Sequence, residues 1–220
     1  MLNKSKGNMY SWVTHTWNTV KGCCPHNCSY CYMKRWGDLH SMRFDKREIK
    51  TNLGEGNFIF VGSSCDMFAD AVPMEWIQDT VEKMNAHNNR YLLQSKNPGR
   101  IAAYLGGILR PVTVCTTIET NRWYPKVMRD SPRPEVRAHA MATLAGYERY
   151  VTIEPIIDFD LVPMVELIKR CEPVQVNIGA DSGRNNLSEP DLDKVIELVS
   201  KLNEFTSVIL KRNAQRVLMP

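Results

Sequence analysis

The chain has 220 residues, of which 43% are hydrophobic and 24% are charged, and its formal net charge is +4. These values are typical of a globular chain with enough apolar side chains for a core, so they argue against a disordered protein. No segment approaches the roughly 20 apolar residues of a membrane span, and the first residues lack an apolar signal core. We therefore expect a cytoplasmic protein that forms a single domain over residues 1–220 and does not contact a membrane.

Short β-type runs alternate with helical patterns along most of the chain. The predicted strands are 11–18, 57–62, 90–94, 112–118, 150–154, 174–178 and 207–210. The predicted helices are 74–87, 99–109, 134–144, 161–171 and 189–205. Asp160 is the expected N-cap of the fourth helix, and Ser188 and Asp191 are in capping positions for the fifth.

Strands that alternate with helices in this way form right-handed βαβ units and a parallel sheet. A complete barrel of eight units needs roughly 250 residues, so we expect an α/β fold of another kind. It is an incomplete TIM-like barrel with six or seven βα units and parallel strands, open on one side. Such folds place their chemistry at the carboxyl ends of the strands. Polar residues follow the predicted strands at 62–66, 95–97, 116–119, 154–155 and 177–183.

The chain has seven cysteines, and Cys23, Cys24, Cys28 and Cys31 fall within nine residues just after the first predicted strand. In a reducing compartment, clustered thiols are more often metal ligands than disulfides. Single cysteines such as Cys115 are more often small buried apolar residues. The segment 22–33 is therefore predicted to be a metal-binding loop.

The spacing Cys24-x3-Cys28-x2-Cys31 suits a 4Fe-4S cluster. Three thiolates in a tight loop can each hold one iron, which leaves the fourth iron free for a small ligand. A structural zinc site is the alternative, and it needs four ligands. Cys23 or His26 could be the fourth ligand, although no second pair of ligands follows later in the chain.

The cysteine motif, with Tyr30 before its third cysteine, resembles that of the radical-SAM superfamily. Within it, further segments resemble a short phage-associated family related to spore photoproduct lyase. These segments are 16–18, 22–24, 28–32, 153–155, 179–183 and 210–211.

The resemblance implies a 4Fe-4S cluster and S-adenosylmethionine as cofactors. The activity that it implies is reductive cleavage of S-adenosylmethionine to a 5′-deoxyadenosyl radical, which abstracts hydrogen from a substrate. The protein would orient the cofactors and exclude side reactions. The implied partners are an external one-electron reductant of the flavodoxin or ferredoxin type and a nucleobase, nucleotide or nucleic-acid substrate. We expect a monomer.

The resemblance also implies roles for residues near the cofactor. Ser64 and Asp66 would hold the methionine amino group, although the usual Gly-Gly-Glu of the superfamily is absent. Lys96 would face the methionine carboxylate, and Thr117 and Glu119 the ribose hydroxyls. The alternatives are a solvated loop lysine at Lys96 and a surface acid at Glu119.

Further contacts are expected around the adenine. Asn177 and Gly179 would approach the base, since a glycine lets the backbone come close. Tyr30 would pack beside the adenine, unless it is an ordinary core tyrosine. Glu154 follows an apolar strand, and a buried acid needs a partner, so it either lines the site or forms a structural salt bridge.

Cys65 follows the second strand, where the lyase relatives carry a cysteine that returns a hydrogen atom to the product radical. The relatives have it two residues earlier, at the position of Ser63. Because Cys65 nevertheless follows the same strand, it is the candidate catalytic residue. The alternatives are that it packs in the core or contacts the cofactor. Lys211 and Asp181 are expected to contact the substrate or each other.

Basic and aromatic residues after the cysteine loop could form a face that meets phosphates and bases. They are Lys34, Arg35, Trp36, Arg43, Phe44, Lys46, Arg47 and Lys50. A solvated helical face is the alternative. The rival to an enzyme is a non-catalytic zinc or iron-sulfur module that binds nucleic acid.

Overall fold

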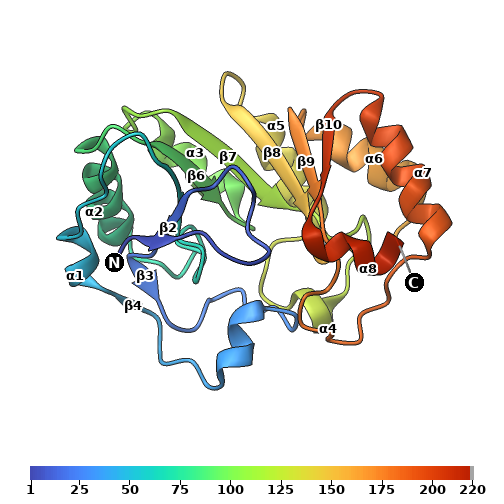
Figure 1. Ribbon diagram of the computed structural model, residues 1–220, viewed down its shortest axis with the longest axis horizontal. Helices are drawn as coiled ribbons and strands as arrows, with labels where there is room; N and C mark the ends of the chain where they lie inside the picture. Colours follow the sequence, from blue (N-terminus) through green and yellow to red (C-terminus); the bar gives the residue numbers. More distant parts are fainter. Residues whose placement is uncertain (219–220) are drawn as a thin grey trace.

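The computed structural model describes residues 1–218, and Figure 1 shows its elements in chain order. The strands are β1 (Asn3–Lys4), β2 (His15–Trp17), β3 (Val20–Lys21), β4 (Arg43–Phe44), β5 (Phe58–Val61), β6 (Arg90–Gln94), β7 (Val112–Thr117), β8 (Glu148–Ile153), β9 (Gln175–Ile178) and β10 (Ser207–Leu210). The α-helices are α1 (Lys46–Ile49), α2 (Met74–Asn85), α3 (Pro98–Leu105), α4 (Pro125–Met128), α5 (Pro134–Ala142), α6 (Leu161–Arg170), α7 (Leu192–Asn203) and α8 (Gln215–Leu218). Two 3-10 helices are η1 (Tyr32–Trp36) and η2 (Arg212–Ala214).

One sheet of eight strands carries the fold, in the order β1-β2-β5-β6-β7-β8-β9-β10. Every neighbouring pair is parallel except β1 and β2. Each new parallel strand lies beside the one before it, as in a barrel, but β1 and β10 are the two edges of the sheet and do not close it. The incomplete, open barrel predicted from the sequence is confirmed.

The crossovers between β5 and β10 each contain a helix, whereas the one between β2 and β5 is different. It contains the cysteine loop, η1, the small sheet of β3 and β4, and the single turn α1. In Figure 1 the turn η1 and α4 lie together on one side of the sheet. None of the helices within residues 1–218 is long and apolar enough to cross a membrane.

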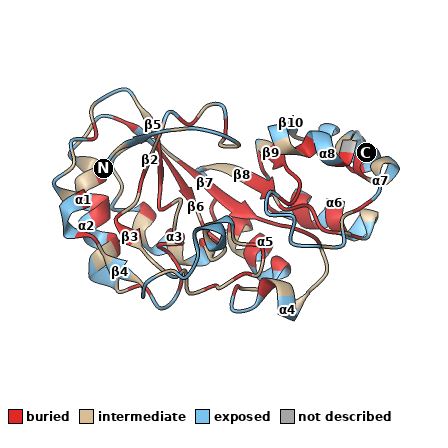
Figure 2. Cartoon of the chain, turned by 60° about the horizontal axis from the view of Figure 1, so that its bottom comes forward, coloured by how far each residue is buried: buried red, intermediate tan, exposed pale blue. Residues whose placement is uncertain are grey.

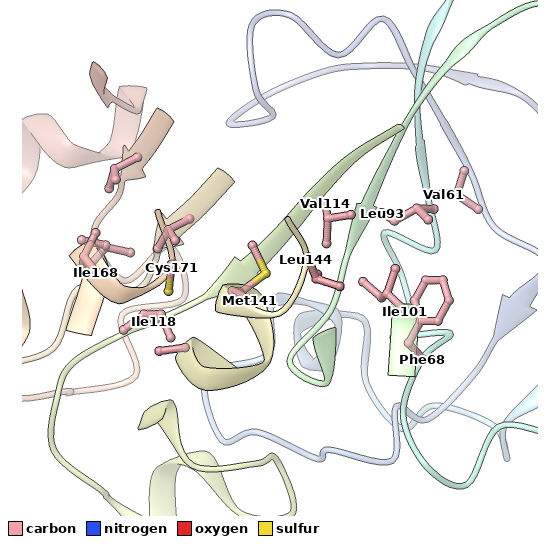
Figure 3. Close-up of a cluster of buried hydrophobic side chains, with 14 of the residues drawn as sticks. Val61, Phe68, Leu93, Ile101, Val114, Ile118, Met141, Leu144, Ile168 and Cys171 are labelled. Carbon is pink, nitrogen blue, oxygen red and sulfur yellow. The ribbon is translucent and has the colours of Figure 1, made fainter. Parts of the chain in front are cut away.

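The larger core lies between the sheet and its helices. Because side chains alternate along a strand, Val61, Leu93 and Val114 point to this side and are almost completely buried. They meet apolar faces of the crossover helices, including Ile101 of α3 and Met141 of α5 (Figure 3). Figure 2 shows the strands as a buried centre with exposed residues on the outer helices.

The opposite, inner face of the sheet is covered by residues 8–14, which we call the N-terminal plug. Tyr10 and Val13 of the plug pack on the alternate strand positions Phe60, Leu92 and Cys115. The rings of Tyr10 and its neighbour in the plug, a tryptophan, are stacked with centroids 5.0 Å apart. The plug therefore fills part of the barrel interior and limits the cavity that remains.

The N-terminal plug also explains why the first predicted strand is shorter than expected. Strand β2 begins at His15, whereas the pattern predicted a strand from Ser11. The backbone turns before this point, where the Val13 N–H donates to the Tyr10 carbonyl at 3.1 Å. The alternation of aromatic and polar residues therefore reflects packing on the inner face and not an extended strand.

Asp160 and Asp191 both occupy N-cap positions, as predicted, but only Asp191 makes a side-chain capping bond. Asp191 caps α7, and its carboxylate accepts from the Lys194 N–H at 3.0 Å. The helix therefore begins at Leu192, and the predicted start at Glu189 is wrong. Asp160 makes no side-chain capping bond to α6, because its carboxylate binds the Arg122 guanidinium at 2.6 Å.

Replacing Leu93 by Ala should destabilise the protein by about 2–5 kcal/mol, because Leu93 is fully buried in the larger core and its removal leaves a cavity. Urea unfolding followed by circular dichroism measures this change. Leu109→Ala is the matched control, since Leu109 is 78% exposed and should change stability by less than about 0.5 kcal/mol. Equal effects of the two substitutions would contradict the described core.

Candidate active site

A cavity of about 440 Å³ lies at the carboxyl ends of the parallel strands. The segments that follow the strands line it, together with part of the N-terminal plug. The lining includes residues 23–24, 30–35, 62–66, 94–96, 154–155 and 180–182. As predicted, the polar loops that follow the strands lie together, and they surround one cavity.

The three motif cysteines all line this cavity. Cys28 is buried, and Cys24 and Cys31 are half-buried. Tight turns shape the loop: the Asn27 N–H donates to the Cys24 carbonyl at 3.0 Å, and the Cys31 N–H donates to the Cys28 carbonyl at 3.3 Å. Asn27 has a φ of 49°, in the left-handed region that Asn tolerates better than most residues. The loop thus turns on itself and presents three thiols to one space.

Gly22 fixes the entry to the cysteine loop. Its φ is 100°, and a Cβ atom there would lie 2.4 Å from the Ser41 carbonyl oxygen. The backbone therefore passes too close to the segment before β4 for any other residue. The next residue, Cys23, is exposed at the edge of the cavity, and its N–H donates to the His40 carbonyl at 2.8 Å.

His26 anchors the cysteine loop to the sheet. Its ring is 4% exposed, and Nε2 lies 2.9 Å from Oδ2 of Asp66, just after β5. The same carboxylate accepts from the Ser95 hydroxyl at 2.9 Å and from the Lys96 N–H at 2.8 Å. Burial alone would lower the pKa of His26, but the Asp66 carboxylate raises it above its usual value. Both side chains are therefore engaged with each other, and Nε2 of His26 is not free to bind a metal ion.

Cys65 lies next to the cysteine loop and also lines the cavity. It is 2% exposed. Contact with the Cys65 thiol lowers the pKa of Cys24. The same contact and burial raise the pKa of Cys65. A lowered thiol pKa favours the thiolate, which is the form that binds metal.

A buried ionic network forms one wall of the site. Glu119 is completely buried, and its carboxylate accepts from Arg137 Nη1 at 2.7 Å and from the Tyr30 hydroxyl. Lys96 Nζ lies 3.4 Å from the same carboxylate and 5.4 Å from the centre of the Tyr30 ring. Burial alone would raise the pKa of Glu119, but Arg137 and Lys96 hold it below its usual value. Glu119 is thus neither a surface acid nor part of the cavity lining, whereas Tyr30 and Lys96 do line the cavity.

Ser64 has a hydroxyl without a partner. Its Oγ is buried and makes no hydrogen bond within residues 1–218, although its N–H donates to the Asn18 side chain at 2.9 Å. The neighbouring Ser63 hydroxyl is satisfied by the same Asn18 oxygen at 3.2 Å. Since a buried polar group without a partner is costly, Ser64 Oγ is a ready contact for a ligand in the cavity.

Glu154 organises the other end of the cavity. Its carboxylate accepts from Nδ2 of Asn8 and of Asn213, each at 2.7 Å, and pairs with Lys211. Lys211 therefore pairs with Glu154 and, among residues 1–218, forms no ion pair with Asp181, which was one of its two expected contacts. Thr117 lines the same part of the cavity, and its hydroxyl accepts from Nε2 of a neighbouring strand glutamine at 3.3 Å.

Asn177 and Gly179 lie behind this end of the cavity and are not among its lining residues. Asn177 is 1% exposed, and its Nδ2 has no partner within residues 1–218. A Cβ atom on Gly179 would come within 2.9 Å of the Glu154 carboxylate. Oδ1 of Asn213 would lie 2.8 Å from the same Cβ, so the side chains of Glu154 and Asn213 leave no room for a larger residue at Gly179.

The predicted basic aromatic face divides into separate parts. Phe44 stacks on Trp76 with ring centroids 5.7 Å apart, and Arg47 pairs with Asp45 at 3.0 Å, so neither contributes to a continuous face. The part beside the cavity is η1. There, the Arg35 guanidinium lies 5.1 Å from the centre of the Trp36 ring, which is 68% exposed.

Sequence reasoning missed several residues that build the site. Asn8 and Asn213 hold Glu154, and Arg137 balances Glu119. Asn8 and Arg137 lie far from any motif or predicted strand end, and Asn213, although it follows the last strand, has a role that depends on Glu154, 59 residues away. His26 stood within the motif, but its role as an anchor depends on Asp66, which is 40 residues away.

Comparison with known proteins places this chain in a family. One family profile matches residues 8–186. The chain belongs to the family described as protein of unknown function (DUF5131). No curated protein matches the sequence.

Among solved structures, those of spore photoproduct lyase are similar in fold to the DUF5131 chain. A cysteine-to-serine mutant of spore photoproduct lyase matches with a TM-score of 0.63 at 12% identity, over 94% of this chain and 78% of the lyase chain. The lyase complexed with dinucleoside spore photoproduct gives 0.61 at 12% identity with the same coverage. A double mutant with bound AdoMet and the same dinucleoside gives 0.62, again at 12% identity and with that coverage. The DUF5131 chain thus has the fold of spore photoproduct lyase.

Replacing Glu119 by Gln should destabilise the DUF5131 protein by about 3–5 kcal/mol near pH 7, because Arg137 would keep a buried charge without its partner. Urea unfolding of both proteins measures the difference.

The same pair of proteins tests the pKa of Glu119. Since this pKa is lowered in the folded state, the stabilisation by Glu119 is present above the unfolded value of about 4.3 and is lost as the pH falls through the folded value. The difference between the two proteins should therefore shrink below about pH 4. A difference that does not change with pH would show that Glu119 is not ionised in the fold.

Proposed function

We propose that this protein is a radical S-adenosylmethionine enzyme. The observation that carries the proposal is the position of Cys24, Cys28 and Cys31 on one cavity at the carboxyl edge of a parallel sheet. That edge is where parallel α/β folds hold their reactive groups. The likeness in fold to a lyase solved with bound AdoMet supports the same activity class.

The donor set fits a 4Fe-4S cluster with three protein ligands. No three His, Cys, Asp or Glu side chains of residues 1–218 converge as the ligands of a single ion would. Thiolates around a cubane bind different irons and therefore need not converge on one point. His26 is held by Asp66, so it is not available through Nε2 as a fourth ligand. This arrangement favours a cluster with one free iron over a closed zinc site.

When bound, the cluster and S-adenosylmethionine would supply the one-electron chemistry that removes a hydrogen atom from the substrate. The residues of this chain would bind and orient the cofactor. Ser64 Oγ is free to accept a hydrogen bond from the methionine amino group. Lys96 lines the cavity with an ammonium group suited to the methionine carboxylate. Thr117 lines it at the position proposed for the ribose.

Other predicted residues would shape the site from behind. Asp66 holds the cysteine loop through His26, and Glu119 holds Lys96 and Tyr30 in place. Glu154 would form the wall beside the adenine, and Asn177 and Gly179 would support that wall. Cys65, next to Cys24, is the thiol we propose as the catalytic residue of this cavity.

We propose a nucleobase as the substrate, carried by a nucleotide or a nucleic acid. The exposed Trp36 and Arg35 beside the cavity suit stacking on a base. The lyase of similar fold was solved in complex with dinucleoside spore photoproduct. An external one-electron reductant would be the second partner, and the protein would act as a monomer.

Cys24→Ala, Cys28→Ala and Cys31→Ala should each abolish cluster retention, because each removes one of the three proposed ligands. Iron and sulfide content after anaerobic reconstitution measures retention, and 5′-deoxyadenosine release from S-adenosylmethionine under reductant measures activity. Cys23→Ala is the matched control and should keep both. A colourless parent protein that holds zinc and releases no 5′-deoxyadenosine would favour the non-catalytic nucleic-acid-binding module instead.

Ser64→Ala should weaken the binding of S-adenosylmethionine by about 2–10-fold, since one hydrogen bond contributes about 0.5–1.5 kcal/mol. Protein stability should stay the same, because the Ser64 hydroxyl has no partner within residues 1–218. Equilibrium dialysis of the reconstituted protein measures the affinity. Ser63→Ala is the control, since its hydroxyl already binds Asn18. Unchanged affinity in Ser64→Ala would remove this contact from the proposal.

A further inference from the structure

A second hollow adjoins the cavity. It has a volume of about 340 Å³ and shares Asp181 and Ser182 with the cavity. Its wall includes three arginines, Arg184, Arg212 and Arg216. We call it the arginine hollow. The loop after β9 and the segment η2–α8, which supply these arginines, come together at the C-terminal side of the sheet (Figure 1).

The positive charges of the arginine hollow are not balanced by carboxylates of its own lining. Asp181 is the one carboxylate among the lining residues, and it is used by its own loop, where it accepts from the Gly183 N–H at 3.0 Å and from Nδ2 of Asn185 at 2.6 Å. Arg216 is neutralised by Glu189 at 2.6 Å. Arg184 and Arg212 are exposed and form no ion pair with any residue of 1–218. Two guanidinium groups therefore remain free to bind an anion.

The two free arginines stand on well-fixed backbone. Arg184 has a φ of 51°, an unusual conformation for its residue type, and the hydrogen bonds to Asp181 hold the loop in this shape. Arg212 directly follows Lys211, whose N–H donates to the Ile178 carbonyl at 2.8 Å and whose ammonium pairs with Glu154 of the cavity wall. The arginine hollow and the cavity are thus parts of one scaffold, so a ligand bound in one can be oriented in the other.

We propose that the arginine hollow binds a phosphate group of the substrate through Arg184 and Arg212 while the rest of the substrate enters the cavity. This inference rests on the proposed function, because it assigns the substrate a phosphate and a direction of entry. Guanidinium groups bind phosphate through paired N–H donors and do so better than ammonium groups. Asn213 and Gln215 add neutral polar groups to the same wall.

Binding of defined probes to the full-length reconstituted protein tests the proposal. The probes are a dinucleoside monophosphate, the corresponding 5′-mononucleotide, the unphosphorylated nucleoside and inorganic phosphate, each measured by isothermal titration calorimetry. The variants are Arg184→Ala, Arg212→Ala and the double variant. Arg170→Ala is the matched control, since Arg170 is an exposed arginine at the end of α6, outside both cavities.

The phosphate-bearing probes should bind more tightly than the nucleoside, and the double variant should lose at least about tenfold of that affinity. Its affinity should also depend less steeply on salt, because fewer phosphate contacts are made. Arg170→Ala should bind like the parent. Iron content and melting temperature should be unchanged in the double variant, since both side chains are exposed. If the double variant melts lower, Arg184→Lys with Arg212→Lys, which keeps both charges, should bind more tightly than the double Ala variant.

Equal binding of phosphate-bearing probes by the parent and the double variant would overturn the proposal, regardless of whether the protein holds an active cluster. Arginine-dependent binding by a protein that never releases 5′-deoxyadenosine would instead support the arginine hollow and contradict the proposed function. The two failures are therefore distinguishable. Tighter binding of the dinucleoside monophosphate than of the mononucleotide would identify a nucleic-acid strand as the source of the phosphate, and the reverse order would identify a free nucleotide.

Discussion

The site depends on the carboxylate of Asp66, which is largely shielded from water, with a side chain that is 11% exposed. A buried charge is tolerated only when it is paired and fully hydrogen-bonded, and Asp66 meets this condition by accepting from His26, Ser95 and the Lys96 N–H. These three donors come from the cysteine loop and from the end of β6, while Asp66 itself follows β5. The electrostatic requirement of a single side chain thus fixes the position of the thiols relative to the sheet.

The incomplete barrel gives the cavity its shape. A closed barrel of eight strands fills its interior with layers of side chains, whereas here the N-terminal plug covers part of the inner face. The remaining space lies between the cysteine loop on one side and Glu154 on the other. Apolar residues of the plug seal one end, and polar side chains at the strand ends line the other, so the position of the cavity follows from the alternation of side chains along each strand.

The elements with strong local patterns were predictable from the sequence. Strand β6 has the predicted bounds, and α2 buries Ile77, Val81 and Met84 on the predicted face. The short pieces β1, β3, β4 and α1 were not predicted, because segments of two to four residues carry too little periodicity. The N-terminal plug was mistaken for part of a strand, since its aromatic residues alternate like those of a half-buried sheet.

The candidate site was predictable in outline but not in its partners. The cysteine spacing and the order of polar segments placed Ser64, Lys96 and Thr117 on the cavity. The sequence could not show that Glu119 is closed off by Arg137, because the two residues meet only through the packing of α5 against the end of β7. Likewise, the amide groups that hold Glu154 come from positions near both ends of the chain, far from it in sequence.

The contact between Asn8, Asn213 and Glu154 affects the order in which the protein folds. Asn213 donates its N–H to the Asn8 side chain, across 205 residues, and both amides meet at Glu154. Contacts of such sequence separation form late and slow the folding of a chain. During synthesis, the cysteine loop leaves the ribosome well before β10 is available to complete the far wall. Until then the cavity is unfinished and open to solvent, and it can exclude water only after the last strand has joined the sheet.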